Sequence, residues 1–206
     1  MAGILIPAVL LAGPGWICST AWGKRVLVSG VILLIAPGVF QITARSHELL
    51  RVKTLAVGEG RDRFLAFPPE LNSVGELVRL TTSALQLHPE DRTVIVIPEG
   101  IMINYLARRP SPAAPFVFYA HVTAGEREAE LVRLLEQNPP SCVVPISRDL
   151  REYGIERYGE KYGSGRAILE WLIRDYETVA SVGGGPLDNS QVGAALLRPK
   201  ASQPGP

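Results

Sequence analysis

The chain has 206 residues, with 21 Lys and Arg against 20 Asp and Glu, a net charge of +1, and 47% hydrophobic residues. This near-neutral balance argues against a protein that binds nucleic acid through a strongly basic face. The two cysteines, Cys18 and Cys142, are too few for a disulfide framework.

The N-terminal region predicts membrane segments. Residues 1–44 contain no acid, and only Lys24 and Arg25 interrupt two uncharged runs, residues 1–23 and 26–44. A helix needs roughly 20 apolar residues to cross a bilayer, and each run is about that long. The very short connection between the runs therefore predicts a hairpin of two transmembrane helices. A signal peptide is the alternative for the first run, but the run lacks a basic start and a small-x-small cleavage site.

The rest of the chain predicts one α/β domain over residues 45–198 and a disordered tail over 199–206. Patterns of period 2 or continuous apolar runs predict strands at 49–57, 64–67, 93–97, 141–146, 178–182 and 191–197. Helical periodicity predicts helices at 73–87, 101–108, 123–137 and 165–176, two of which begin with the capping-box spacing at Ser73 and Thr123. Strands that alternate with amphipathic helices predict a mixed, partly parallel sheet, covered on both faces, with an antiparallel pair at its end.

Glu99 is the first candidate for a functional residue. It follows the strand at 93–97, and open α/β sheets bind ligands at the carboxyl ends of their strands. Arg148 and Asp149 follow the strand at 141–146, so two parallel strands would bring them to the same edge. A carboxylate there could act as an acid, a base or an acceptor for a hydroxyl. Alternatively, Glu99 only complements a helix dipole, and the other two residues form a surface ion pair.

The other motifs are weaker candidates for functional sites. Three Tyr-Gly pairs begin at Tyr153, Tyr158 and Tyr162, and they suit sugar stacking, a membrane interface or ordinary loop packing. The three histidines have no metal-ligand spacing, and the glycines at 183–185 precede a proline and not a helix with a lysine. We therefore expect neither a metal nor a cofactor.

One segment, residues 97–112, contains Pro98-Glu99-Gly100, Asn104-Tyr105-Leu106 and Arg109-Pro110-Ser111-Pro112. Together with Asn138-Pro139-Pro140, the later Tyr-Gly pairs and the helix through Trp171, these motifs resemble the C-terminal region of bacterial polytopic glycosyltransferases of the GT-C type. That group is mannosyltransferase-like and includes families 39 and 83. The likeness covers most of residues 45–187.

The resemblance implies a function in sugar transfer. Members of the family move a sugar from a polyprenyl-phosphate donor to a glycan or protein acceptor at the outer face of the inner membrane. The implied partners are therefore membrane lipid, the donor and an acceptor, with the domain on the periplasmic or extracellular side. Basic residues favour the opposite orientation slightly, since Arg45, Arg51 and Lys53 outnumber Lys24 and Arg25. The candidate substrate-binding residues are Glu99, Asn104, Arg108, Arg148 and Asp149.

The chain also departs from the family pattern. Family members carry their catalytic acid in a loop after the first of many transmembrane helices, whereas the first acid here is Glu48. We therefore expect the C-terminal part of such an enzyme, without its catalytic half and inactive alone. Two alternatives remain: a non-catalytic membrane-anchored domain that binds a glycan or a protein, and an independent enzyme that uses Glu99 with Asp149.

Overall fold

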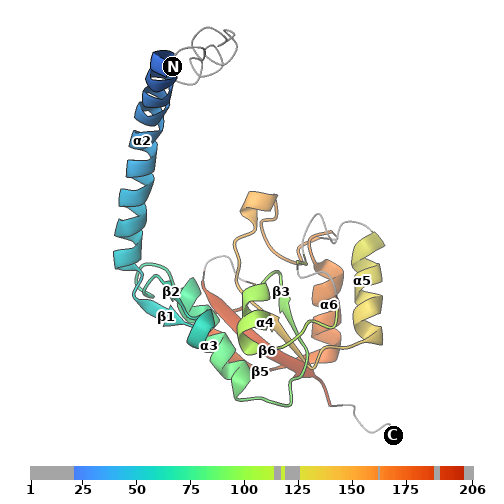
Figure 1. Cartoon of the computed structure of the whole chain (residues 1–206). Helices are drawn as coiled ribbons and strands as arrows, with labels where there is room; N and C mark the ends of the chain where they lie inside the picture. Colours follow the sequence, from blue (N-terminus) through green and yellow to red (C-terminus); the bar gives the residue numbers. More distant parts are fainter. Residues whose placement is uncertain (1–20, 114–116, 119–125, 162, 188–190, 202–206) are drawn as a thin grey trace, which may run out of the picture. The chain divides into compact units, whose positions relative to one another are not determined.

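The computed structural model describes residues 21–113, 117–118, 126–161, 163–187 and 191–201 (Figure 1). The chain divides into two compact units, residues 1–52 and residues 53–206. Each unit is described by itself below.

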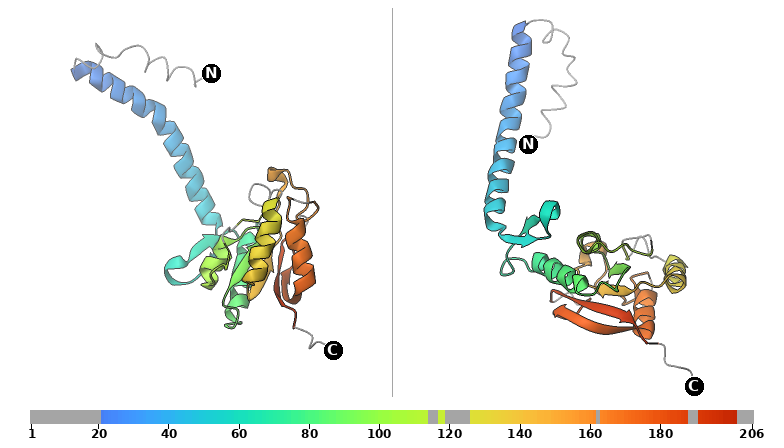
Figure 2. Two further views of the ribbon diagram at one scale, coloured as in Figure 1. Left: turned by 90° about the vertical axis from the view of Figure 1, so that its right-hand side faces the viewer. Right: turned by 60° about the horizontal axis from the view of Figure 1, so that its bottom comes forward.

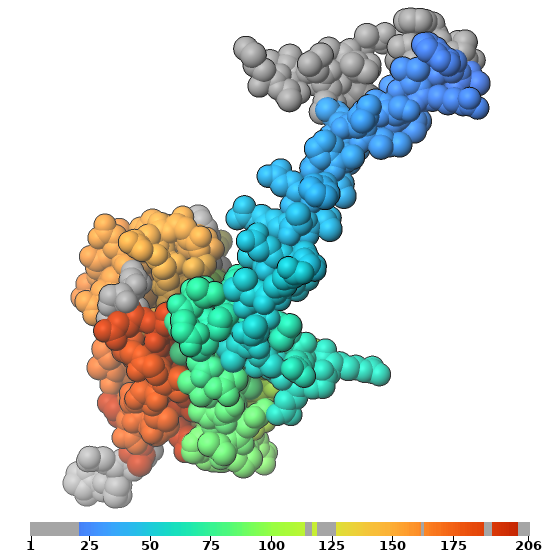
Figure 3. All heavy atoms as spheres, turned by 90° about the vertical axis from the view of Figure 1, so that its left-hand side faces the viewer, coloured from blue at the N-terminus to red at the C-terminus, as the bar shows by residue number. Residues whose placement is uncertain are grey.

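The first unit consists, within its described part, of one helix of 32 residues, α2 (Ala21–Val52). At 1.5 Å per residue the helix is about 48 Å long, which exceeds the roughly 30 Å of a bilayer core. Its apolar side chains are exposed along its length (Figure 3). The helix is thus long and apolar enough to cross a membrane, although a signal sequence near an N-terminus has the same properties.

Helix α2 corrects two expectations. Gly23, Lys24 and Arg25 lie inside it and do not form a turn between two helices. Long basic side chains can reach out of an apolar environment while the backbone stays helical, so two of them do not force a turn. Residues 1–20 lie outside the described part, and the hairpin is not shown. The helix also continues to Val52, where a strand was expected from residue 49, because Leu49, Leu50 and Arg51 favour helix.

The second unit is built on a four-stranded mixed sheet with the strand order β3-β4-β6-β5. Strands β3 (Val94–Ile97) and β4 (Cys142–Pro145) are parallel. Strand β6 (Gly193–Pro199) runs antiparallel to both β4 and β5 (Tyr176–Gly183). A separate antiparallel pair joins β1 (Leu55–Val57) and β2 (Phe64–Ala66). The predicted α/β class with a mixed, partly parallel sheet is confirmed.

Helices cover both faces of this sheet (Figures 1 and 2). Helices α3 (Val74–Gln86) and α4 (Ile101–Ala107) pack on one face, while α5 (Glu126–Gln137) and α6 (Arg166–Asp175) pack on the other. Alternate residues of β3 explain this arrangement: Val94 and Val96 join the α3–α4 core, and Ile95 and Ile97 join the core around Trp171. Burial on both faces is why the strand reads as an uninterrupted β-branched run.

Two local expectations differ from the structure. Ser73 makes no capping hydrogen bond with its side chain at the start of α3, and the Asn72 Oδ1 accepts a hydrogen bond from the Val74 amide at 2.9 Å. The other capping residue, Thr123, lies outside the described residues. At the carboxyl end, β6 includes Pro199, and the Lys200 Nζ donates to two carbonyls at the end of α6, at 2.8 and 3.0 Å. The start of the expected tail is therefore held against the domain.

Candidate functional site

The carboxyl ends of β3 and β4 lie side by side, because the strands are parallel and Ile97 is opposite Pro145. The end of β5 and the start of β6 reach the same edge of the sheet, where the Ser147 amide donates to the Gly193 carbonyl at 2.7 Å. Three connections therefore meet here: the turn before α4, the segment after β4 and the β5–β6 connection. This carboxyl edge is where ligands bind in open α/β sheets.

The turn that carries Glu99 needs a glycine beside it. A Cβ atom on Gly100 would lie 2.3 Å from the Val96 Cγ1 and 2.9 Å from its Cβ, which is closer than two carbon atoms can approach. Only glycine lets the chain leave β3 and enter α4 over that short distance. The tight turn sets Glu99 at the sheet edge, where it is half-buried and its backbone bridges to Val117.

Glu99 and Arg148 form the centre of an ion-pair cluster. The Arg148 Nε donates to the Glu99 Oε1 at 2.6 Å, and the Arg148 Nη2 donates to the Glu152 Oε1. The hydrogen bond to Glu99 raises the pKa of the Arg148 guanidinium above its usual value. The side chains of Arg148 and Glu99 remain 37% and 28% exposed, so water screens the pair and its contribution to stability is about 1 kcal/mol or less. One guanidinium thus joins two acids at an accessible edge.

Asp149 lies beside this cluster but has another partner. Its carboxylate accepts hydrogen bonds from the Arg151 Nε at 2.9 Å, the Arg151 Nη2 at 2.5 Å and the Arg151 amide at 3.0 Å. The bonds from Arg151 lower the pKa of Asp149 to about 2. Asp149 is therefore ionised throughout the physiological pH range and does not supply a proton.

Asn104 and Arg108 do not reach the carboxyl edge. The buried Asn104 Nδ2 donates to the carbonyls of Val94, at the start of β3, and Arg109, at 2.7 and 3.1 Å. This pairing ties the end of α4 to the opposite end of the strand from Glu99. Arg108 pairs with Asp62, and its guanidinium lies 4.6 Å from the centre of the Tyr105 ring. Of the five predicted binding residues, three stand at the edge and these two do not.

A buried acid that was not predicted as functional lies in α5. Glu128 is 1% exposed, and its carboxylate accepts from the Gly163 and Ala167 amides, both at 2.6 Å. It thereby holds the first turn of α6 and the segment before it. Helical periodicity could have predicted that Glu128 is buried, because it lies three residues before Leu131 and seven before Leu135 on the apolar face of α5.

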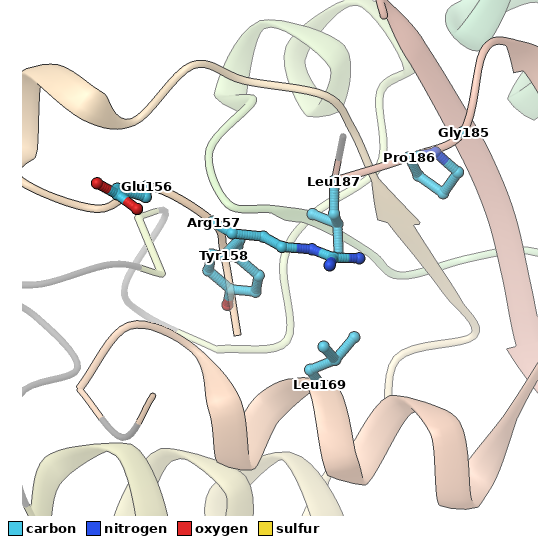
Figure 4. Close-up of a pocket in the computed structure, with 7 residues that line it drawn as sticks. All are labelled: Glu156, Arg157, Tyr158, Leu169, Gly185, Pro186 and Leu187. Atoms are coloured by element: carbon cyan, nitrogen blue, oxygen red, sulfur yellow. The ribbon is translucent and has the colours of Figure 1, made fainter. Parts of the chain in front are cut away.

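A cleft of about 540 Å³ opens at the same edge (Figure 4). Its lining comes from the segment after β4, from α6 and from the β5–β6 connection: Glu156, Arg157, Tyr158, Leu169, Gly185, Pro186 and Leu187. The Ser147 Oγ donates to the Gly185 carbonyl at 2.9 Å and so ties the cleft to the loop that carries Arg148. This volume falls within the range of small-molecule sites.

The Tyr-Gly pairs have separate roles. Tyr153 is 39% exposed, whereas Tyr158 is 4% exposed and packs its ring against Gly165, where a Cβ would lie 2.1 Å from the Tyr158 Cζ. Burial and the nearby charge of Glu128 raise the pKa of the Tyr158 hydroxyl. Tyr162 lies outside the described residues. Tyr158 is thus a core residue that also forms part of the cleft wall.

Among the described residues, no group of three His, Cys, Asp or Glu side chains is arranged to hold a metal ion. No family model, curated protein or solved structure matches this chain.

Proposed function

We propose that this chain is a membrane-anchored, extracytoplasmic domain of a glycosyltransferase that uses a polyprenyl-phosphate sugar donor, and that residues outside this chain perform the chemistry. The domain would bind a sugar or an acceptor at the carboxyl edge of its sheet. The Glu99–Arg148–Glu152 cluster carries the proposal, because it stands at the ligand-binding edge and Glu99 belongs to the segment that resembles the GT-C enzymes. The long apolar α2 supports the membrane anchor.

The edge is better suited to binding than to proton transfer. During sugar transfer, the bond between the sugar C1 and the phosphate oxygen breaks, and C1 bonds to the acceptor oxygen. The phosphate leaves on the lipid, and a base takes the acceptor proton. Here Glu99 and Glu152 are bound to Arg148, and Asp149 is bound to Arg151, which lowers its pKa to about 2 and makes it a weak base. Such carboxylates can accept hydrogen bonds from sugar hydroxyls and so orient a substrate.

The test is cleavage of the donor in membranes. Membranes of the source organism, with and without the gene for this chain, are given a radiolabelled polyprenyl-phosphate sugar, and the polyprenyl phosphate released is counted. Release should fall on deletion and return with the wild-type chain. Release should stay low with Arg148→Gln, which removes the guanidinium that joins Glu99 to Glu152. It should recover with Arg92→Gln, a matched change at an exposed arginine before β3. Equal release with and without the chain would refute the proposal.

The orientation has its own test. We propose that the domain faces the periplasm or the cell exterior. Alkaline phosphatase fused after the last residue should be active, and a green fluorescent protein at the same place should be dark. The reverse pattern would place the domain in the cytoplasm, as the count of basic residues favours.

A second candidate function is a non-catalytic, membrane-anchored domain that binds a glycan or a protein on its own. The cleft favours it, since a small-molecule site does not require a catalytic partner. This second function predicts that donor cleavage is the same with and without the chain and that the purified chain binds a ligand.

A further inference from the structure

The cleft at the carboxyl edge contains an arginine with an unusual environment. Within the described residues, no acidic side chain lies at ion-pair distance from Arg157. Its neighbours in sequence differ, because Arg148 binds Glu99 and Glu152, and Arg151 binds Asp149. The guanidinium extends from the segment after β4 across the cleft toward Leu187, while the carboxylate of Glu156 points away from it (Figure 4). Arg157 therefore places a positive charge in the cleft that no acid among the described residues neutralises.

The rest of the cleft wall combines apolar side chains with Glu156. The half-buried Leu169 lies across from Arg157, and Leu187 and Pro186 form another side (Figure 4). Gly185 also lines the cleft, and a Cβ there would meet nothing within 4 Å, so the position has room for a larger side chain. Arg157 and the apolar side chains suit a ligand that combines one anionic group with a body that offers an apolar face. A pyranose ring meets the second condition through its C–H face, which packs against aromatic and aliphatic side chains.

We propose that this cleft binds an acidic sugar, with Arg157 pairing its carboxylate or phosphate and with Leu169, Pro186 and Leu187 contacting the ring. An arginine suits both anions, because its planar fork donates two parallel hydrogen bonds to either. The choice of a sugar rests on the proposed function, whereas the anion and the apolar face come from the cleft itself. The site is separate from the Glu99–Arg148–Glu152 cluster and is joined to it through Ser147.

The experiment uses the full chain in lipid nanodiscs and isothermal titration calorimetry. The probes are glucuronic acid, glucose 6-phosphate, glucose and inorganic phosphate, so that carboxylate, phosphate and neutral sugar are compared. One of the two acidic sugars should bind more tightly than glucose, and more tightly than inorganic phosphate. Arg157→Gln should weaken that binding roughly tenfold or more, the loss expected for a charge-assisted contact, while Arg92→Gln should leave it unchanged.

A second pair of variants tests the location. Gly185→Trp should abolish binding, since Gly185 lines the cleft and a bulky side chain has room there at its Cβ, and Gly185→Ala should preserve it. Circular dichroism confirms that each variant is folded. The proposal is overturned if no probe binds, if glucose binds as well as both acidic sugars, or if Arg157→Gln and Gly185→Trp bind like the wild type. None of these results changes the expected donor cleavage in membranes, so failure here is distinguishable from failure of the proposed function.

Discussion

Replacing Glu128 by alanine should destabilise the domain by about 3–6 kcal/mol. The change removes the two hydrogen bonds that the carboxylate accepts from the Gly163 and Ala167 amides, each worth roughly 1.5–3 kcal/mol. It also leaves a cavity, because the side chain is among the largest that are fully buried. The hydrogen bonds that are lost hold the segment that leads from Tyr158 into α6.

The assay is denaturant unfolding of the full chain in detergent, followed by near-ultraviolet circular dichroism, which reports the packing of the buried Trp171 and Tyr176. Glu130→Ala is the matched control, since Glu130 lies on the exposed side of α5, and its change should cost less than about 0.5 kcal/mol. A destabilisation by Glu128→Ala of under 1 kcal/mol would show that the carboxylate does not hold the two amides as described.

Three further predictions concern packing and titration. Gly100→Ala should cost about 1–3 kcal/mol in urea unfolding, because its Cβ would lie 2.3 Å from Val96; a smaller cost would mean that the turn has room. The carboxyl group of Asp149, followed by NMR at its carboxyl carbon, should titrate near pH 2, and Arg151→Gln should return its pKa toward 3.8. The stabilisation that the Asp149–Arg151 contact gives the folded chain is therefore present above pH 3.8 and is lost as the pH falls toward 2. Burial raises the pKa of Cys142 to about 12 against an ordinary 9.0. With the other cysteine changed to serine, the thiol should resist maleimide in the folded chain and react in denaturant, and stability should fall as the pH rises above 9.0. Labelling of the native chain at the denatured rate would contradict its burial.

Under the proposed function, this domain would hold a substrate while residues outside this chain perform the chemistry. An enzyme that acts at a membrane on a lipid-linked donor must also hold an acceptor or a growing product. The carboxyl edge offers two different surfaces, an ion-pair cluster rich in acceptors and a cleft in which Arg157 has no acidic partner among the described residues. Acidic and neutral parts of one glycan would bind to them differently, which is why the two sites need separate variants.

Much of the local structure followed from the sequence. The periodicity of α3 and α6 and the β-branched run of β3 gave their positions within one or two residues, because such patterns reflect contacts with one face of the core. The meeting of Glu99 with Arg148 also followed, since two parallel strands end at one edge. Where a pattern was ambiguous, as at Gly23 and at residues 49–52, the helical preference of the neighbouring residues prevailed.

Tertiary structure decided the partners of the charged side chains. Asn104 lies in the same motif as Glu99, yet it bonds to the far end of β3, because α4 runs back along the strand. Glu128 and Gly163 are far apart in the chain, and only the packing of α5 beside α6 brings them together. The cleft likewise combines three segments that no short motif connects. Sequence patterns report which face of an element is buried, whereas the packing of distant elements determines what each polar group meets.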